Sequence, residues 1–246
     1  MGRLNSFYLA PLYWREPFCL EGEEAHHLIR VLRAKNGDTI RLFDGQGRWG
    51  LFTIRESSKN SAQLTRLSEQ VTTRPQQALT LAVGWSKGLR RGFLLEKAVE
   101  LGVGAIWFWQ AARSQGEIPE QGREGWHKQM VAAAKQCGTT WLPQISTFGS
   151  ADHVAAHGGN FGSRVLCWER ETGCLLHPRD LIGEQGTLAV LGPEGGLEHG
   201  EAQILQDSGF KAVSLGPHIM RFETAAFFVL SLACWAAGAD PGRSQG

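Results

Sequence analysis

The alternation of polar and apolar positions divides the chain into two regions with different patterns. In the first region, short stretches such as TIRLFDG, GRWGLFTIRES and SAQLTRL alternate apolar with polar side chains, which is typical of half-buried antiparallel strands. Asp44-Gly45 and Gly47, between two of these stretches, predict a hairpin turn. Residues 23–34 interrupt the strands with a helical pattern and an apolar face. The pattern predicts a small, mostly antiparallel β module.

From about residue 79 the pattern changes to short apolar runs bounded by glycine, which alternate with helical segments. The expected strands are LTLAVGW, AIWFW, RVLCWE, TLAVLG and KAVSLG, and the expected helices are RRGFLLEKAVELG, GWHKQMVAAAKQCG, EAQILQDSG and ETAAFFVLSLACWAAG. This alternation predicts an α/β domain with a parallel sheet and helices on its faces. The polar segment 68–77, which contains Pro75, separates the two regions, so we expect domains at 1–73 and 74–246.

Composition narrows the class of protein. The chain of 246 residues is 42% hydrophobic and 20% charged, which is typical of a globular protein and argues against disorder. No run approaches the roughly 20 apolar residues that span a bilayer, and the first residues lack the apolar core of a signal peptide. We therefore expect a cytoplasmic protein with no membrane partner.

The metal-binding residue types are not arranged for a metal site. The five cysteines include no C-x-x-C pair, and the eight histidines include no H-E-x-x-H motif. We expect reduced thiols and no metal.

The charge is unevenly distributed between the two regions. Residues 1–75 carry 11 basic against 8 acidic side chains, a net +3, whereas the whole chain carries only +1. A modest basic excess on the β module is compatible with an RNA-contacting domain, although such an excess is common in other domains too.

A glycine-rich turn follows one of the predicted strands, in LAVLGPEGGLEHGE at residues 188–201. No Lys-Ser or Lys-Thr follows it, as a P-loop would require, and its spacing differs from the dinucleotide motif G-x-G-x-x-G. A purely structural explanation is a tight turn that needs a positive φ at Gly195 or Gly196, with Glu194 solvated.

A second segment, SLGPHIMRFETAAF, also follows a predicted strand and leads into a helix at Glu223-Thr224. Ligands of parallel sheets bind at the carboxyl ends of the strands, so these two turns are expected on one edge. Exposed backbone N–H and C=O groups suit adenine, whereas a carboxylate suits ribose hydroxyls or a cation and repels phosphate. The two turns together predict a nucleoside ligand with little or no negative charge.

The order of these motifs resembles one family. LGPEGGLEHGE followed by VSLGPHIMRFETA resembles the SPOUT superfamily of S-adenosylmethionine-dependent RNA methyltransferases, and more closely its bacterial 16S rRNA uridine-N3 methyltransferases of the RsmE type. HHLIRVLRAKNGDTIRLFDGQG, LLEKAVELGV and ARS extend the resemblance over most of the chain. It implies a trefoil-knot methyltransferase domain, a PUA-like RNA-binding β-barrel at the N-terminus and a homodimer. The implied cofactor is S-adenosylmethionine, and the implied partner is 16S rRNA or the small ribosomal subunit.

The resemblance assigns cofactor contacts to both turns. The implied cofactor-binding residues are Leu191, Gly192, Glu194, Gly195, Gly196, Leu215, Gly216, Ile219, Met220 and Thr224.

Two residues beside the second turn are candidates for catalysis. Arg221 is expected to stabilise negative charge on the uracil carbonyls or to hold a phosphate. Glu223 is expected to assist removal of the N3 proton or to orient Arg221. Glu223 also has a structural explanation, because an acid in the first turn of a helix is favoured by the helix dipole.

The implied RNA contacts lie elsewhere. His26, Arg30 and Arg33 are spaced i, i+4 and i+7 on the predicted helix, and Arg113 follows the strand AIWFW. A solvated helix face is the alternative for the first three. Lys97 and Glu100, at i and i+3, are expected to form an ion pair.

Three residues depart from the family pattern. Lys135 stands where an acid is usual, Thr139 where an arginine is usual, and Phe222 where a smaller residue is usual. The first two bear on substrate contacts or local pairing and Phe222 on packing beside the active site, whereas the cofactor turn is intact. Alternatives are a related enzyme that methylates another rRNA or tRNA position, including a ribose 2′-hydroxyl, and a catalytically silent RNA-binding assembly factor.

Overall fold

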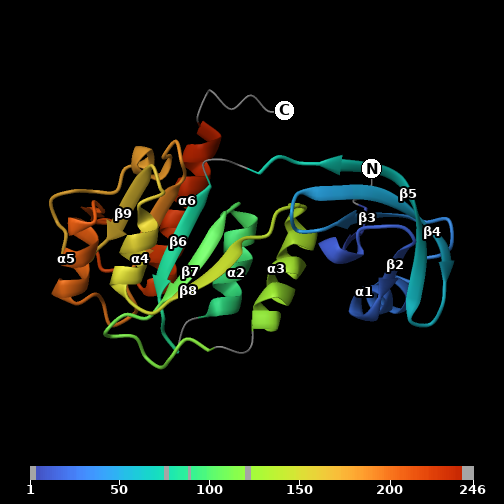
Figure 1. Ribbon diagram of the computed structural model, residues 1–246, viewed down its shortest axis with the longest axis horizontal. Helices are drawn as coiled ribbons and strands as arrows, with labels where there is room; N and C mark the ends of the chain where they lie inside the picture. The colour runs from blue at the N-terminus through green and yellow to red at the C-terminus, as the bar shows by residue number, and fades with distance from the viewer. Residues whose placement is uncertain (1–3, 75–77, 88–89, 120–122, 240–246) are drawn as a thin grey trace. The chain divides into compact units, whose positions relative to one another are not determined.

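The computed structural model describes residues 4–74, 78–87, 90–119 and 123–239, and Pro75 of the expected interdomain segment lies outside them. The chain forms two compact units (Figure 1). The first consists of Met1–Arg74 together with Met130–Leu142, and the second of Pro75–Gln129 together with Pro143–Gly246. The sequence pattern gave no indication that the segment Met130–Leu142 packs with the N-terminal unit.

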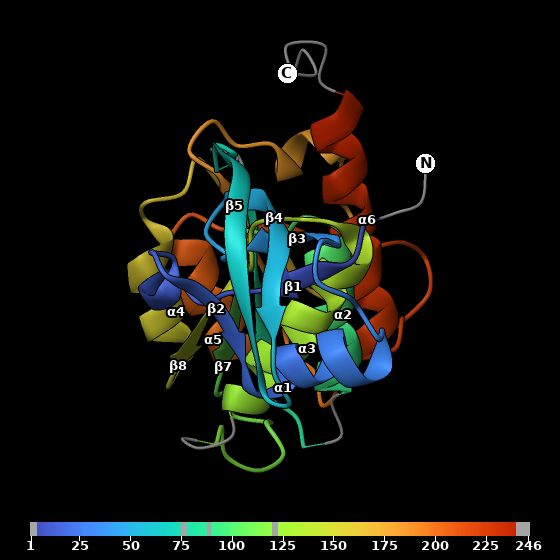
Figure 2. The same ribbon diagram turned by 90° about the vertical axis from the view of Figure 1, so that its right-hand side faces the viewer.

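The first unit is built on a five-stranded sheet with the order β1-β3-β4-β5-β2. Its strands are β1 (Ser6–Tyr8), β2 (Phe18–Glu21), β3 (Thr39–Phe43), β4 (Arg48–Ser57) and β5 (Ser61–Val71). β1 and β3 are parallel and the other pairs are antiparallel, as Figure 2 lets the reader follow. The expected antiparallel β module and the hairpin between β3 and β4 are confirmed.

The core of this unit follows from the alternation along the strands. Phe52 and Ile54 of β4 are almost completely buried, while the residues between and after them reach the surface. Trp14 and Phe18 meet Phe52 edge to face, with ring centroids 5.8 and 5.0 Å apart. Such aromatic contacts stabilise the packing beyond the area that they bury.

The helical segment of the first unit is irregular. α1 (Gly22–His26) is followed by a π-helical turn over His27–Val31, in which the N–H of Leu32 donates to the carbonyl of His27, at 3.0 Å. Arg33 then adopts a left-handed conformation with φ +52°. The expected regular helix over residues 23–34 is therefore wrong in its second half, and Arg33 lies beyond the helix rather than on a face shared with His26.

The segment Met130–Leu142 places Lys135 inside the first unit. The Nζ atom of Lys135 lies 2.9 Å from Oε1 of Glu24 and 5.2 Å from the ring centre of Phe7. The departure from the family pattern at this position thus has a local partner, since the lysine neutralises an acid on α1. Thr139 accepts a hydrogen bond from the N–H of Trp141.

The second unit contains a fully parallel six-stranded sheet with the order β11-β9-β10-β6-β7-β8. Its strands are β6 (Leu79–Gly84), β7 (Ala105–Trp109), β8 (Gln144–Phe148), β9 (Ser163–Cys167), β10 (Thr187–Leu191) and β11 (Lys211–Val213). Every residue of β6 and β10 is buried, as expected for central strands that are covered on both faces. The predicted parallel α/β sheet is confirmed, whereas the trefoil knot stays a prediction.

Helices cover both faces of this sheet (Figures 1 and 2). The helices are α2 (Arg91–Glu100), α4 (Ala151–Gly158), α5 (His199–Asp207) and α6 (Phe222–Ala239). The unit also contains the part of α3 (Arg123–Cys137) up to Gln129. α4 and α5 pack on one another and on Leu166, Leu188 and Val190. α6 contacts α2, β6 and β10.

In the second unit one predicted ion pair is confirmed, whereas two elements were not predicted. The expected ion pair between Lys97 and Glu100 is present on α2, at 2.9 Å. The strand β8 and the helix α4 were not among the elements predicted from the sequence. Among the described residues, no helix is long and apolar enough to cross a membrane.

The ends of β6 and β10 approach each other closely at Gly84. A Cβ atom added to Gly84 would lie 2.6 Å from Cδ of Pro193 and 2.7 Å from the carbonyl carbon of Gly192. Contacts this short force the backbone to shift, so glycine at this position permits the turn after β10 to rest on β6.

We expect two glycine-to-alanine substitutions to have opposite effects on stability. Gly84→Ala should lower the free energy of unfolding by about 1–3 kcal/mol, because the methyl group overpacks the contact with Pro193. Gly125→Ala, on the exposed surface of α3 with open space around its Cβ, should raise it by about 0.5–1 kcal/mol. Urea unfolding measures both, and a neutral Gly84→Ala would contradict the proposed close contact.

Candidate functional site

The turn after β10 exposes backbone on the edge where the strands end. In GPEGG the N–H of Gly196 donates to the carbonyl of Pro193, at 2.8 Å, and Gly196 has a φ of +73°. The positive φ that the sequence predicted for this turn is therefore found at Gly196, where a side chain would be strained. Trp109 anchors the start of the turn, because its buried Nε1–H donates to the carbonyl of Leu191, at 3.2 Å.

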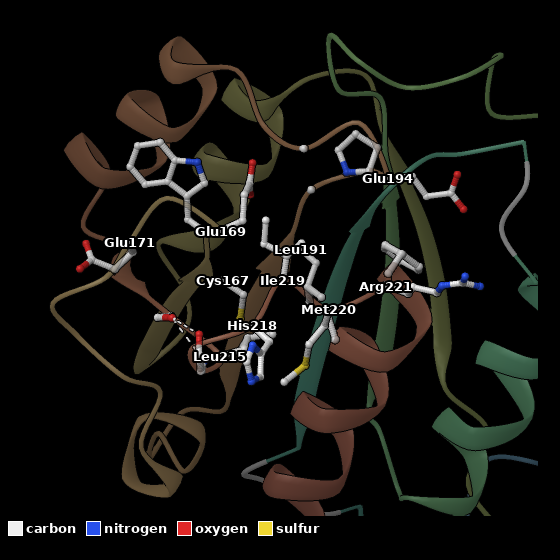
Figure 3. A pocket seen from close by; sticks show the side chains of 18 of the residues that line it. Cys167, Glu169, Glu171, Leu191, Glu194, Leu215, His218, Ile219, Met220 and Arg221 are labelled. Carbon is white, nitrogen blue, oxygen red and sulfur yellow. Dashed lines mark hydrogen bonds between the residues drawn. The ribbon is translucent and has the colours of Figure 1, made fainter.

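The segment after β11 forms a second turn beside the first. The Oγ atom of Ser214 donates to the carbonyl of Gly216, at 3.1 Å, and accepts from the N–H of Gly216, at 3.3 Å. These are the bonds dashed in Figure 3. Gly216 has a φ of +137°, which again favours glycine. The hydroxyl thus holds the backbone of Leu215 and Gly216 in a fixed bend.

Both turns line one pocket of about 890 Å³. This volume falls within the range of small-molecule and cofactor sites. Of the predicted cofactor-binding residues, nine line the pocket: Leu191, Gly192, Glu194, Gly195, Gly196, Leu215, Gly216, Ile219 and Met220. The tenth, Thr224, is exposed on the first turn of α6 and is not among the lining residues.

The candidate catalytic residues Arg221 and Glu223 also line the pocket. Arg221 is exposed at the start of α6 and forms no ion pair within the described part of the chain. In Figure 3 its guanidinium lies on the same side of the pocket as the carboxylate of Glu194. Phe222, where a smaller residue is usual, is 8% exposed and also lines the pocket.

A third strand end contributes to the pocket and was missed by the sequence analysis. The lining residues after β9 are Cys167, Trp168, Glu169, Glu171, Thr172 and Leu175. RVLCWE was recognised as a strand, and the rule that ligands bind at the carboxyl ends of parallel strands could have indicated the residues that follow it. The adjacency of β9 to β10 was needed to place them.

The groups of this third segment differ in their roles. Burial raises the pKa of the Cys167 thiol to about 12, so it remains protonated and is a poor nucleophile at neutral pH. Oε1 of Glu171 accepts hydrogen bonds from the N–H groups of Gly173 and Cys174, at 2.7 and 3.1 Å. The carboxylate of Glu171 therefore holds its own loop.

Arg113 lies against the outside of the first turn rather than in the pocket lining. Its Nη1 atom donates to the carbonyl of Gly195, at 3.3 Å, and its Nε atom lies 3.8 Å from Oε1 of Glu198. The preceding N–H, of Ala112, donates to Glu201 on α5, at 2.8 Å. The loop after β7 therefore supports the turn after β10.

The other predicted RNA contacts, His26, Arg30 and Arg33, lie in the first unit. All three are exposed and form no ion pair with the residues that the structure describes. Exposed Val31 and Leu32 lie between them in sequence. A π-helical turn often marks a functional segment.

The apolar side chains and exposed backbone groups of the pocket fit a nucleoside. Leu191, Leu215 and Met220 are apolar, and the glycine turns expose backbone groups between them. No cluster of three or more potential metal ligands occurs within the described ranges.

Comparisons with known proteins identify the family of the chain. Residues 73–234, more than half of the chain, match the model of the RNA methyltransferase domain, and residues 20–65 match that of the RNA methyltransferase PUA domain. The "Ribosomal RNA small subunit methyltransferase E" of Bacillus subtilis is 28% identical over 87% of this chain and 88% of its own length.

Solved structures show the same architecture. A ribosomal RNA small subunit methyltransferase E from Neisseria gonorrhoeae, bound to S-adenosyl methionine, has a TM-score of 0.79, 27% identity, and coverage of 93% of this chain and 96% of its own. A probable rRNA-methyltransferase from Porphyromonas gingivalis has a TM-score of 0.83, 27% identity, and coverage of 96% and 98%. The two-domain match and the pocket of glycine turns lead to one conclusion: the chain belongs to the RNA methyltransferase family with an N-terminal PUA domain.

Proposed function

We propose that this protein transfers a methyl group from S-adenosylmethionine to N3 of a uridine in small-subunit (16S) ribosomal RNA. The observation that carries the proposal is the single pocket that joins two glycine turns to Arg221 and Glu223. The names of its relatives, ribosomal RNA small subunit methyltransferases, support the substrate class. With this activity the protein would work in the cytoplasm, with rRNA or the small ribosomal subunit as its partner.

Different residues of the pocket would bind the cofactor and take part in methyl transfer. Backbone groups of the turns at Gly192 and Gly216, with Leu191, Leu215 and Met220, would hold the adenosine part of the cofactor. When bound, S-adenosylmethionine supplies a methyl group on a positively charged sulfur. Arg221 and Glu223 lie where the base to be methylated would enter, at the start of α6.

Methylation of uracil at N3 requires removal of a proton, and this requirement defines the proposed roles of Arg221 and Glu223. N3 carries a proton at neutral pH, so it becomes a nucleophile only when that proton leaves. The carboxylate of Glu223 accepts this proton or orients Arg221, and the Arg221 guanidinium stabilises the negative charge that develops on the uracil carbonyls.

The first unit would position the RNA. His26, Arg30 and Arg33 form an exposed basic segment, and we assign residues 1–73 to RNA binding and residues 74–246 to methyl transfer. Arg113 has a second role besides the RNA contact proposed from sequence, because it donates to the carbonyl of Gly195.

A homodimer would use the exposed apolar side chains of the second unit. Phe93 on α2 and Phe228 and Trp235 on α6 are 45%, 40% and 63% exposed. Because α2 and α6 contact one another, we propose their exposed apolar side chains as the surface that a second copy covers.

The product of the reaction tests the proposed function. Small-subunit rRNA from cells that lack this protein should contain unmethylated uridine at one position, and restoring the protein should return N3-methyluridine there. Mass spectrometry of rRNA fragments measures the change. Methylation at a ribose hydroxyl, or an unchanged pattern, would overturn the proposal.

We expect Glu223→Gln to slow methylation on the order of 100-fold while the Kd for S-adenosylmethionine changes less than about twofold, because only proton removal is lost. Asp152→Asn is a matched control, since Asp152 also lies in the first turn of a helix, α4. The Asp152→Asn variant shows how much the loss of a carboxylate from the first turn of a helix changes the rate through the helix dipole alone. Single-turnover rates and calorimetry give the two quantities, and an unchanged rate removes Glu223 from the chemistry.

The double substitution Arg30→Ala with Arg33→Ala should weaken RNA binding about tenfold at low salt and leave cofactor affinity unchanged. Loss of two phosphate contacts should also reduce the slope of log K against log salt by about 1.5. Arg55→Ala with Lys59→Ala removes the same charge elsewhere on the first unit. Equal losses of RNA affinity in the two double variants would mean that only the net charge of the first unit determines RNA binding, and not the position of Arg30 and Arg33.

A further inference from the structure

Glu169 is a carboxylate in the pocket that the protein leaves without a partner. It follows β9 by two residues and lines the pocket. Its carboxylate accepts no hydrogen bond and forms no ion pair with any residue in the described ranges. Its neighbour Glu171 differs, because backbone N–H groups at Gly173 and Cys174 satisfy it. Glu169 is exposed, so its carboxylate is open both to water and to the hydrogen-bond donors of a ligand in the pocket.

The carboxylate of Glu169 lies against the first glycine turn. A Cβ atom added to Gly196 would lie 2.5 Å from Oε1 of Glu169 and 3.3 Å from its Cδ. The absence of a side chain at Gly196 therefore gives the carboxylate its place against the turn. In Figure 3 Glu169 extends from the end of β9 toward the turn.

The second free carboxylate, Glu194, lies on the other side of the pocket. It is exposed, and Figure 3 shows it on the side of Arg221, away from Glu169. Since Arg221 and Glu223 are assigned to the methyl-accepting base, the reacting end of the cofactor faces them. The part that does not react then faces Glu169.

The hydrogen-bonding groups of the non-reacting part of the cofactor indicate which of them contacts Glu169. The apolar side chains of Leu191, Leu215 and Met220 suit the adenine ring, whereas the ribose presents two hydroxyl donors. A carboxylate is an acceptor that can bind both hydroxyls, and hydrogen bonds to a charged acceptor are the stronger kind.

We propose that Glu169 is the residue that recognises the ribose of the cofactor by accepting hydrogen bonds from its hydroxyls. This inference rests on the proposed function, and it makes Glu169 a specificity determinant. The site should accept adenosine-based ligands with free ribose hydroxyls, and it should reject those with a ribose phosphate through charge repulsion.

Calorimetry with S-adenosylhomocysteine tests the inference. The wild-type protein is titrated first, and failure to bind would overturn the proposed function itself. In a protein that binds, Glu169→Gln should weaken S-adenosylhomocysteine and S-adenosylmethionine equally, by about tenfold, since both carry the same ribose. Glu184→Gln is the matched control, because Glu184 is an exposed carboxylate outside the pocket lining, and it should change the Kd less than about threefold.

Ribose analogues provide a test that needs no variant. The 2′-deoxy or the 3′-deoxy form of S-adenosylhomocysteine should bind wild-type protein about tenfold more weakly than the parent compound, and the difference should shrink to about twofold in Glu169→Gln. Two results would overturn the inference while leaving the proposed function intact. One is a loss for S-adenosylmethionine without a loss for S-adenosylhomocysteine, which would assign Glu169 to the sulfonium charge. The other is unchanged binding of the deoxy analogues and of the variant.

Discussion

The parallel register of β9, β10 and β11 is the constraint on which the site depends. Leu191 is paired with Cys167, and Cys167 with Val213, so the three strands end at the same level. Because all three run in the same direction, the loops that follow them emerge on one edge of the sheet. The pocket is the space between these three loops, and its lining residues come from segments far apart in the sequence.

Supporting contacts keep the first of these loops in place. Gly84 lets the end of β6 pack against Pro193, Trp109 donates to Leu191, and Arg113 donates to Gly195. These three contacts hold the turn after β10 in place. The backbone groups of the turn that line the pocket remain free to bind a ligand. Preorganised backbone groups lose little freedom on binding, which favours affinity.

The charges of the pocket are arranged around a ligand that is not a phosphate. The pocket lining contains four carboxylates, and one of them, Glu171, is committed to its own loop. Arg221 lies on one side with Glu194, and Glu169 lies apart from them against Gly196. In the proposed function, this separation would give the pocket one end for methyl transfer and another for recognition of the donor.

The sequence by itself determined the elements that depend on local periodicity and on turn chemistry. The alternating strands of the first unit, the buried runs of the second and the glycine turns at Gly196 and Gly216 could all be predicted, because each reflects forces within a few neighbouring residues. The π-helical turn with left-handed Arg33, the pairing of Lys135 with Glu24 and the approach of Glu169 to Gly196 could not. These last features depend on strand order and on contacts between distant segments, and no local pattern encodes which strand lies beside which.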